Sequence, residues 1–347
     1  MRKVPVEQAI GLVLAHDVTE ISAERRIKRR AFRRGHVICA EDVARLKDLG
    51  KNEIFIDEDC DRDSALGPGK SVHEDDAALT VAPLAAGLGI EHDPEPSEGK
   101  INFRATCSGL FKVDKDRQLL INSLAIPSFP TIPDNFPVDK GRTVAAFRII
   151  PLTCERKIID RVMEILDTPL LQVMPYRVKT AGVVVTGNEV FEGRITDGFV
   201  PRLTYILSPF GVRVISSEIL PDDREKISAA VSRTAEACDL VFVTGGTSVD
   251  PDDVTVGGMV DAGVKILTKG APIQPGNNFT IGYRAGIPVC AVPAAAIFHQ
   301  TTALDIFLPR LLAGDCITPA EISSMGHGGL CLQCPECTFP ICTFGKP

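Results

Sequence analysis

Apolar and polar positions alternate most regularly between residues 177 and 312. The runs at 179–187 and 239–246 are continuously apolar and end in glycine, which is typical of strands buried on both faces of a sheet. The region as a whole predicts strands at 179–187, 212–220, 239–246, 264–268 and 287–292, and helices at 199–211, 223–237, 254–263 and 294–312. This alternation predicts a doubly wound α/β fold with a mostly parallel sheet, whose ligands bind at the carboxyl ends of the strands.

The first 176 residues have a more mixed pattern, typical of smaller N-terminal α+β or β domains. The segment 40–50 predicts a helix and 52–57 a strand, followed by a polar, turn-rich stretch at 58–76. Beyond it, strand-like runs occupy 101–114, 117–126 and 141–152, and a linking helix is expected at 155–166. The expected domains are an α/β unit at 1–57, a β-rich domain at 77–176, an α/β domain at 177–312 and a cysteine-rich tail at 313–347.

Length and charge narrow the range of functions. The chain has 347 residues, enough for two or three domains, and a formal net charge of −7. This charge argues against a general nucleic-acid binder, because phosphate binding needs a basic surface. No run approaches the ~18 uninterrupted apolar residues of a membrane helix, and the first residues lack a signal-peptide core. We therefore expect a soluble, cytoplasmic protein.

Three loops are expected to meet at the carboxyl edge of the predicted sheet. They follow the strands at 179–187, 212–220 and 239–246. The third loop places two glycines before two hydroxyl residues, so that backbone N–H groups and hydroxyls can face an anion. The candidate binding residues in the first and third loops are Thr186, Gly187, Glu189, Gly245, Gly246, Thr247, Ser248 and Asp252.

Two acidic residues in these loops, Asp222 and Asp253, are the candidate catalytic residues and Mg²⁺ ligands. Carboxylates beside a phosphate site repel the phosphate unless a divalent cation lies between them, and Mg²⁺ binds one or two carboxylates together with substrate phosphates. Either residue alone could instead cap a helix, since both precede predicted helices. Their occurrence on two loops of one sheet edge favours a metal–phosphate site.

The same loops resemble the molybdopterin-binding domain of molybdenum cofactor biosynthesis proteins. The motifs that carry the resemblance are TGNEV at 186–190, ILPDD at 219–223 and VTGGTSVDPDDVT at 243–255. The resemblance covers residues 177–312. It implies that Asp222 and Asp253 bind Mg²⁺ or position a pyrophosphate, and that the Gly-Gly-Thr-Ser segment at 245–248 contacts phosphate or pterin.

Resemblance to one branch of this family, the molybdopterin molybdenumtransferases, extends to VPVEQAIGLVLAHDVT at 4–19. A group of bacterial molybdopterin-binding proteins shares the AFxxGHVI pattern at 31–38 and a cysteine-rich tail. The chain departs from the molybdenumtransferases at 21–36, where ISAERRIKRRAFRRGH replaces their proline-rich, Asp-Gly-containing segment. In two further departures, the family's Pro-Gly-Lys-Pro is Pro275-Gly276-Asn277-Asn278 here, and its Leu-Pro-Gly-Asn-Pro is Val292-Pro293-Ala294-Ala295-Ala296. These changes remove a lysine charge and a close backbone approach, while Pro275 and Gly276 remain candidate cofactor contacts.

The tail contains four closely spaced cysteines, Cys331, Cys334, Cys337 and Cys342. Four soft ligands within a short turn-rich segment suit Zn²⁺ in tetrahedral geometry or an iron–sulfur cluster. A disulfide pair or a reduced tail without metal is the alternative. We expect a compact knuckle whose removal leaves the α/β domain folded.

The basic run between residues 25 and 34 has two interpretations. It is either a solvated face or a receiver for an anionic ligand or an acidic partner protein. Its members are Arg25, Arg26, Lys28, Arg29, Arg30, Arg33 and Arg34.

Two functions follow from the resemblance. The first is a transferase, similar to molybdopterin molybdenumtransferase, that binds molybdopterin or adenylyl-molybdopterin and promotes Mg²⁺-dependent molybdenum insertion. The second is a non-catalytic carrier that delivers finished cofactor to a molybdoenzyme or works with another biosynthesis protein. Nucleotide hydrolysis by the same fold would share the pocket without needing the tail. The amino-terminal resemblance implies a homodimer, since that region pairs across subunits in the molybdenumtransferases.

Overall fold

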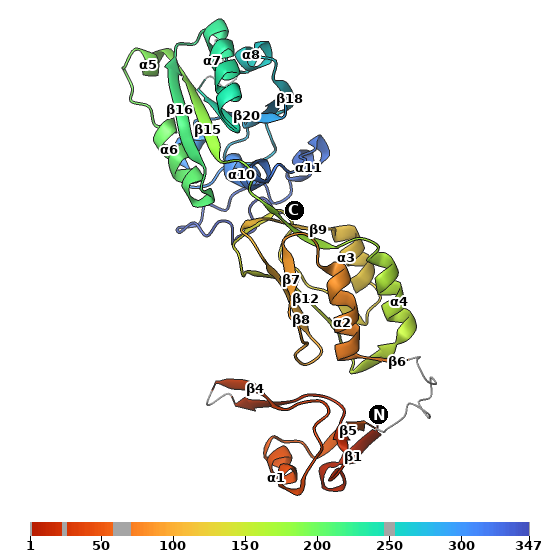
Figure 1. Ribbon diagram of the computed structural model, residues 1–347. Helices are drawn as coiled ribbons and strands as arrows, with labels where there is room; N and C mark the ends of the chain where they lie inside the picture. Colours follow the sequence, from red (N-terminus) through yellow and green to blue (C-terminus); the bar gives the residue numbers. More distant parts are fainter. Residues whose placement is uncertain (1, 23–25, 58–70, 246–253, 347) are drawn as a thin grey trace. The chain divides into compact units, whose positions relative to one another are not determined.

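The structure is a computed structural model that describes residues 2–22, 26–57, 71–245 and 254–346. The chain divides into two compact units (Figure 1). The amino-terminal unit holds the residues up to Thr106, Val113–Ile132 and Lys140–Gln172. The sheet unit holds Cys107–Lys112, Pro133–Asp139 and the residues from Val173 onward. Among the described helices, none has the length and apolar character needed to span a membrane.

The first part of the amino-terminal unit is built on a small antiparallel sheet in the order β1-β5-β2. Its elements are β1 (Arg2–Pro5), η1 (Val6–Gln8), β2 (Val13–Leu14), β3 (Val18–Ser22), β4 (Ile27–Phe32), α1 (Ala40–Asp48) and β5 (Glu53–Asp57). The helix and the last strand lie where the sequence predicted them. Val6, Leu14 and Leu46 are fully buried in one apolar core, so this segment has a hydrophobic centre of its own.

The hairpin β3–β4 carries the basic run, and several of its cations are paired within the chain. Arg30 Nε lies 2.8 Å from the carboxylate of Asp17, of which only 9% is exposed. The further pairs are Arg29 with Glu20, Lys28 with Glu98, and Arg34 with Asp75 and Asp76. Arg25 lies outside the described residues. These pairs favour the interpretation as a surface face, because the paired cations already have internal counter-charges.

The rest of this unit combines three helices with an antiparallel sheet in the order β10-β12-β8-β7 and the pair β13-β6. Its elements are β6 (Ser71–His73), α2 (Glu74–Ala85), β7 (Ile90–His92), β8 (Ile101–Ala105), α3 (Lys115–Asn122), β10 (Pro127–Ser128), β12 (Thr143–Ile149), β13 (Thr153–Glu155) and α4 (Arg156–Ile165). The strand expected at 117–126 is wrong: this run lies mostly in α3. Asp114 explains the difference, since its side chain accepts a hydrogen bond from Arg117 N and caps a helix.

The sheet unit is centred on a six-stranded sheet in the order β16-β15-β17-β20-β19-β18. Its first four strands are parallel, whereas β19 and β18 are antiparallel to their neighbours. The elements are β15 (Thr180–Thr186), α5 (Asn188–Phe191), α6 (Phe199–Leu207), η2 (Ser208–Phe210), β16 (Arg213–Leu220), α7 (Arg224–Ala237), β17 (Leu240–Thr244), α8 (Thr255–Asp261), β18 (Lys265–Lys269), β19 (Thr280–Arg284), β20 (Ile287–Val292), α9 (Ala295–Phe298), α10 (Ala303–Ala313) and α11 (Pro319–Ser324). A smaller sheet joins β9 (Gly109–Val113), β11 (Phe136–Val138) and β14 (Leu171–Pro175).

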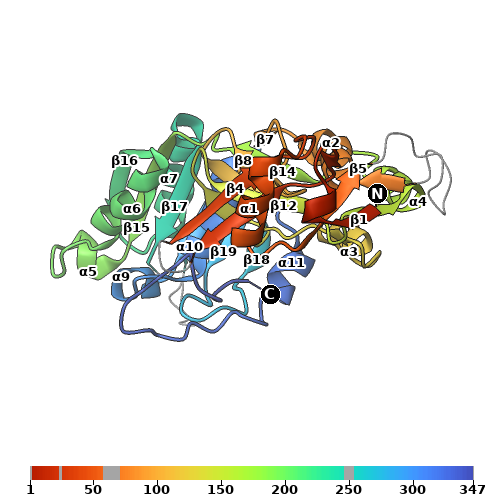
Figure 2. The same cartoon turned by 90° about the horizontal axis from the view of Figure 1, so that it is seen from below.

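Helices cover both faces of the six-stranded sheet, as the continuous apolar runs predicted (Figures 1 and 2). Val183 and Val185 belong to the core that includes side chains of α6 and α10, whereas Val184 belongs to the core with α7 and α8. Successive residues of a strand point to opposite faces, so both faces of β15 are apolar. The doubly wound, mostly parallel α/β fold is therefore confirmed.

Two details of the sheet unit differ from the sequence prediction. The strand β19 had no counterpart in the predicted order, and the single helix expected at 294–312 is split into α9 and α10. The split occurs because Thr302 starts a new helix: its backbone N–H donates to Asp305 at 2.7 Å, and Thr302 and Asp305 form a capping box.

The carboxyl-terminal segment is part of the core of the sheet unit. Phe344, at 4% exposed, and Met325, at 5%, belong to the same apolar cluster as the sheet residues Val183 and Phe242. Buried Arg310 holds the first part of the tail, donating to Asp315, to the carbonyl oxygen of Cys316 and to Glu321. Tail side chains are therefore buried in the core of the sheet unit, and the expectation that this unit stays folded without the tail stays a prediction.

Candidate functional site

The carboxyl ends of four parallel strands form one edge of the six-stranded sheet. Thr186 is paired in register with Leu220, Val185 with Thr244, and Thr244 with Val292. The loops that begin at Gly187, Pro221, Gly245 and Pro293 therefore start side by side. This is the edge at which ligands bind in open α/β sheets.

The first two loops are joined by reciprocal hydrogen bonds between Asn188 and Asp222. Asn188 N donates to the Asp222 carboxylate at 3.1 Å, and Asp222 N donates to the Asn188 side-chain oxygen at 3.2 Å. The cap of α7 is the next residue, Asp223, whose carboxylate accepts from Glu225 N and Lys226 N. The hydrogen bond from Lys226 N lowers the pKa of Asp223. Helix capping is thus performed by Asp223, and Asp222 is left to connect two loops at the sheet edge.

Two buried threonine hydroxyls lie beside Gly245, the residue at which the third loop begins. The Thr186 hydroxyl lies 3.0 Å from both the Thr244 carbonyl oxygen and the Thr255 hydroxyl, and the Thr255 hydroxyl donates to the Gly245 carbonyl oxygen at 3.1 Å. Thr186, Thr244 and Thr255 are buried. These contacts fix the direction in which the chain leaves β17.

Gly245 is required by this geometry. Its φ is +85°, and a Cβ atom there would lie 2.0 Å from the Thr186 carbonyl oxygen. A side chain would collide with the backbone of the neighbouring strand's end. The third loop can therefore start close to the first only with glycine at this position.

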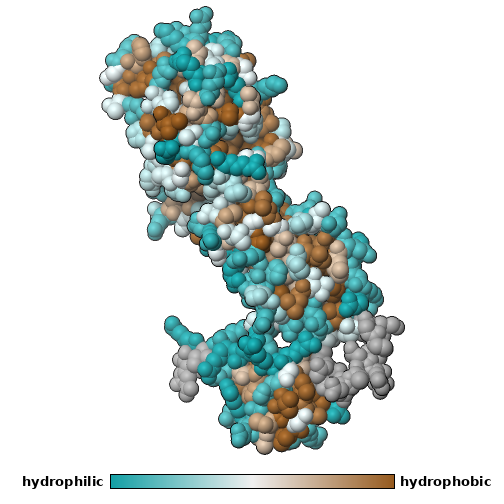
Figure 3. Space-filling model, in the orientation of Figure 1, coloured by the Kyte–Doolittle hydropathy of each residue, from teal (hydrophilic) through white to brown (hydrophobic). Residues whose placement is uncertain are grey.

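The remaining predicted residues of the third loop lie outside the described residues. They are Gly246, Thr247, Ser248, Asp252 and Asp253. In the first loop, Gly187 is buried and Glu189 is exposed. Two apolar side chains are exposed in and just after α5: Phe191 is 53% and Ile195 58% exposed. Figure 3 shows apolar patches among hydrophilic surface on the visible face of the sheet unit.

Pro275 and Gly276 lie against the start of α10. The Pro275 carbonyl oxygen accepts from Ala303 N at 3.0 Å, and a Cβ atom at Gly276 would lie 3.0 Å from the same nitrogen. On the other side, Gln274 exchanges backbone hydrogen bonds with the tail, accepting from Cys331 N and donating to the Gly329 carbonyl oxygen, each at 2.8 Å. These contacts show a packing role for the loop.

The loop after β20 is anchored by Arg202, which no sequence motif indicated. Its guanidinium donates to the carbonyl oxygens of Ala296 at 3.0 Å, His299 at 3.0 Å and Gln300 at 2.8 Å. Only tertiary structure could find this residue, since it sits on α6 about one hundred positions from its partners and belongs to no motif.

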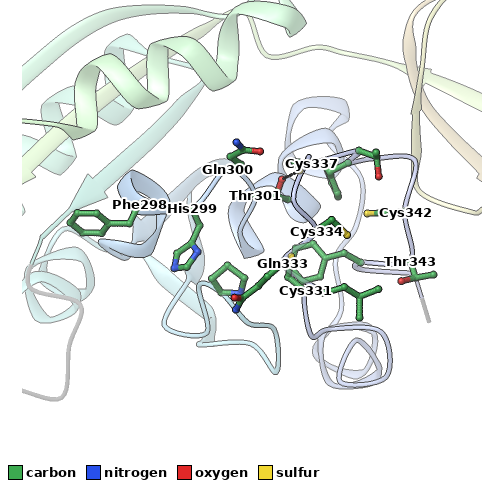
Figure 4. A pocket seen from close by; sticks show the side chains of 15 residues that line it. Phe298, His299, Gln300, Thr301, Cys331, Gln333, Cys334, Cys337, Cys342 and Thr343 are labelled. Carbon is green, nitrogen blue, oxygen red and sulfur yellow. Dashed lines mark hydrogen bonds between the residues drawn. The ribbon is translucent and has the colours of Figure 1, made fainter.

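A pocket of about 220 Å³ lies between the loop after β20 and the tail (Figure 4). All four tail cysteines line it, together with His299, Gln300 and Thr301 of the loop and Pro275. Figure 4 shows the sulfur atoms of Cys334 and Cys342 on the tail side, with His299 at the opposite end. Within the described residues, no three His, Cys, Asp or Glu side chains are arranged to hold a metal ion. The structure thus brings the four thiols to one cavity without a preformed coordination site.

Two family models match the chain. Residues 182–313 match the family described as "Probable molybdopterin binding domain", and residues 3–58 match a domain family of unknown function. A CinA-like protein of Desulfosudis oleivorans is 34% identical over 87 residues, covering 25% of this chain and 21% of that protein. A "Putative molybdopterin biosynthesis protein" of Methanocaldococcus jannaschii is 27% identical over 142 residues, covering 34% of this chain and 35% of that protein. The chain thus spans about a fifth to a third of the length of these relatives.

Among solved structures, the molybdopterin biosynthesis enzyme MoaB of Thermus thermophilus is similar, with 18% identity and a TM-score of 0.31 over 38% of this chain and 91% of that one. The matched family region 182–313 begins in β15 and ends with α10, so it contains the sheet edge described above. The motifs of the three loops predicted this match. Residues 182–313 of the chain are accordingly similar to the molybdopterin-binding domain of molybdenum cofactor biosynthesis proteins.

Proposed function

We propose that the sheet unit binds molybdopterin or adenylyl-molybdopterin at the carboxyl edge of β15, β16 and β17, and promotes Mg²⁺-dependent molybdenum insertion as a transferase. The observation that carries the proposal is the reciprocal pairing of Asn188 with Asp222, which holds a carboxylate against the first loop, at the sheet edge where the third loop also begins. Asp222 is free for this role because Asp223 caps the helix.

Mg²⁺ suits the donor set expected at this edge. Asp222 and Asp253 are carboxylates on two loops, and Mg²⁺ binds carboxylate oxygens together with phosphate oxygens. Held there, the ion would neutralise a pyrophosphate group. Gly245 to Ser248 would offer backbone N–H groups and hydroxyls to the same anion. Asp253 and residues 246–248 enter this proposal from the sequence motif alone.

A non-catalytic carrier is the second candidate, favoured by the loop after β20. The alanines at 294–296 replace a glycine of the family motif, and three carbonyl oxygens of this loop accept hydrogen bonds from Arg202. A loop fixed in this way supports binding without supplying new chemistry. We also keep, as proposals from the sequence, the homodimer, the cytoplasmic location and a zinc ion or iron–sulfur cluster at the tail cysteines.

The test is identification of the ligand by mass spectrometry on protein isolated anaerobically in Mg²⁺-containing buffer. We expect a molybdopterin-type pterin with the wild type, and much less of it with Asp222→Ala or Asp253→Ala, because either change removes a carboxylate from the expected Mg²⁺ site. The control is Glu225→Gln, an exposed carboxylate in the first turn of α7. Equal ligand content in all four proteins would exclude the metal–phosphate site.

Catalysis is separated from carriage by a second measurement. A transferase converts adenylyl-molybdopterin and molybdate to molybdenum cofactor with turnover, and Asp253→Ala abolishes that conversion. A carrier keeps stoichiometric cofactor and shows no turnover with the same substrates. These outcomes decide between the two candidates without depending on the tail.

A further inference from the structure

The pocket between the tail and the loop after β20 contains all four cysteines of the tail. Cys331, Cys334, Cys337 and Cys342 line it, whereas none of the other described cysteines does. The pocket's described lining has no Asp, Glu, Lys or Arg side chain. Thiolates would therefore supply its negative charge, and soft sulfur ligands select Zn²⁺ or iron–sulfur centres over Mg²⁺ or Ca²⁺.

The tail is held on both sides of the thiols. Gly345 N donates to the Gly328 carbonyl oxygen at 3.0 Å, which closes residues 328–345 into a loop, and Cys331 N is paired with Gln274. Phe344 fixes the far end by its burial in the core. Because the backbone is already restrained, gathering four thiols around one centre costs less chain entropy than it would in a free segment.

One thiol already contacts the loop after β20. Cys337 Sγ lies 3.2 Å from the Thr301 hydroxyl. A thiolate in that position is an acceptor only, so the hydroxyl would donate to it, and charge-assisted hydrogen bonds are stronger than neutral ones. Arg202 also holds this loop, through the His299 and Gln300 carbonyl oxygens.

We infer that Cys331, Cys334, Cys337 and Cys342 bind one thiophilic metal centre that clamps the tail onto residues 298–301 at the carboxyl end of β20. Binding draws the thiols inward from their positions around the pocket and releases their protons to solvent. Cys337 then links the centre to Thr301, and the loop is held from the tail as well as from Arg202. Neither the metal site nor the clamp rests on the proposed function.

Metal binding is tested on the full chain, purified anaerobically and stripped with a chelator. Titration with Co²⁺ should give a sulfur-to-cobalt charge-transfer band that saturates at one ion per chain and disappears on adding Zn²⁺. Cys334→Ser and Cys342→Ser should weaken binding at least about tenfold. Cys316→Ser is the matched control, since Cys316 is exposed and lies outside the pocket lining. Absence of the band, or equal affinity in all four proteins, would overturn the metal site.

The native metal is distinguished by elemental analysis of unstripped protein. Stoichiometric zinc in a colourless sample identifies a mononuclear site, whereas iron with inorganic sulfide and a visible band bleached by dithionite identifies a cluster. Neither metal in the anaerobic protein contradicts the proposal.

The clamp is tested by hydrogen exchange without any pterin ligand, so its failure is distinct from failure of the proposed function. Zinc (or reconstituted cluster) should slow exchange of the amides of residues 296–302 by about tenfold or more in the wild type, equivalent to ~1.4 kcal/mol. Thr301→Val should keep the metal but lose most of this protection. Unchanged exchange in the wild type, or full protection in Thr301→Val, would refute the clamp.

Discussion

Replacing Phe344 tests whether the tail is part of the core of the sheet unit. The ring is 4% exposed, packs near Phe339 with ring centroids 6.3 Å apart, and belongs to the cluster built around β15, β17 and β20. A buried Phe→Ala change costs roughly 3–5 kcal/mol. We take about 3 kcal/mol for Phe344→Ala, because a site close to the chain end can collapse into part of the cavity.

The assay uses the tyrosines of the protein. The chain has no Trp and three Tyr, and Tyr176, Tyr205 and Tyr283 all lie in the sheet unit. Tyrosine fluorescence during urea unfolding therefore reports on that unit selectively. With a slope of about 2.5 kcal/mol per molar urea, the loss corresponds to a midpoint lowered by about 1 M. The measurement is made with chelator present, so that metal occupancy does not contribute.

Ile341→Ala is the matched control, since Ile341 is in the same tail but 72% exposed. Its midpoint should stay within about 0.2 M of the wild type, because exposed substitutions change stability by no more than ~0.5 kcal/mol. An equal midpoint for Phe344→Ala and Ile341→Ala would refute the argument and restore a tail that is independent of the sheet.

Two further predictions concern a glycine turn and a buried carboxylate. Gly245→Ala should destabilise the sheet unit by clearly more than the control Gly193→Ala, because only Gly245 also approaches the Thr186 carbonyl oxygen. Gly193 has a φ of +74° and open space around it. Equal urea midpoints for the two variants would contradict the close approach. Glu74 is 8% exposed, and burial raises the pKa of its carboxyl from 4.5 to about 7. Between these pH values the folded form binds more protons than the unfolded form. The free energy of unfolding therefore falls as the pH rises from about 4.5 to about 7, by up to ~3 kcal/mol. The melting temperature measured by calorimetry should differ less between pH 5 and pH 8 for Glu74→Gln than for the exposed control Glu95→Gln. The same dependence of melting temperature on pH in both variants would exclude this contribution of Glu74 to stability.

The sequence by itself determined the architecture of the sheet unit and the order of its loops. Continuous apolar runs that end in glycine and alternate with amphipathic segments favour strands buried on both faces, with helices that cover those faces. The motifs at 186–190, 219–223 and 243–255 identified the matched domain, because they fall directly after strands of one edge. Local signals of this kind depend on near neighbours along the chain, so they can be read before any tertiary contact is known.

Tertiary structure decided which residues meet. Asp222 and Asp223 are equally good caps by sequence, and only the position of Asn188 across the sheet edge assigns the cap to Asp223 and the link to Asp222. Arg202 and Phe344 carry no motif, yet one holds the loop after β20 and the other binds the tail into the core. Such contacts join residues that are far apart in the chain. The identity of a side chain determines which groups it can bond to, but the packing of the whole domain determines which of them it meets.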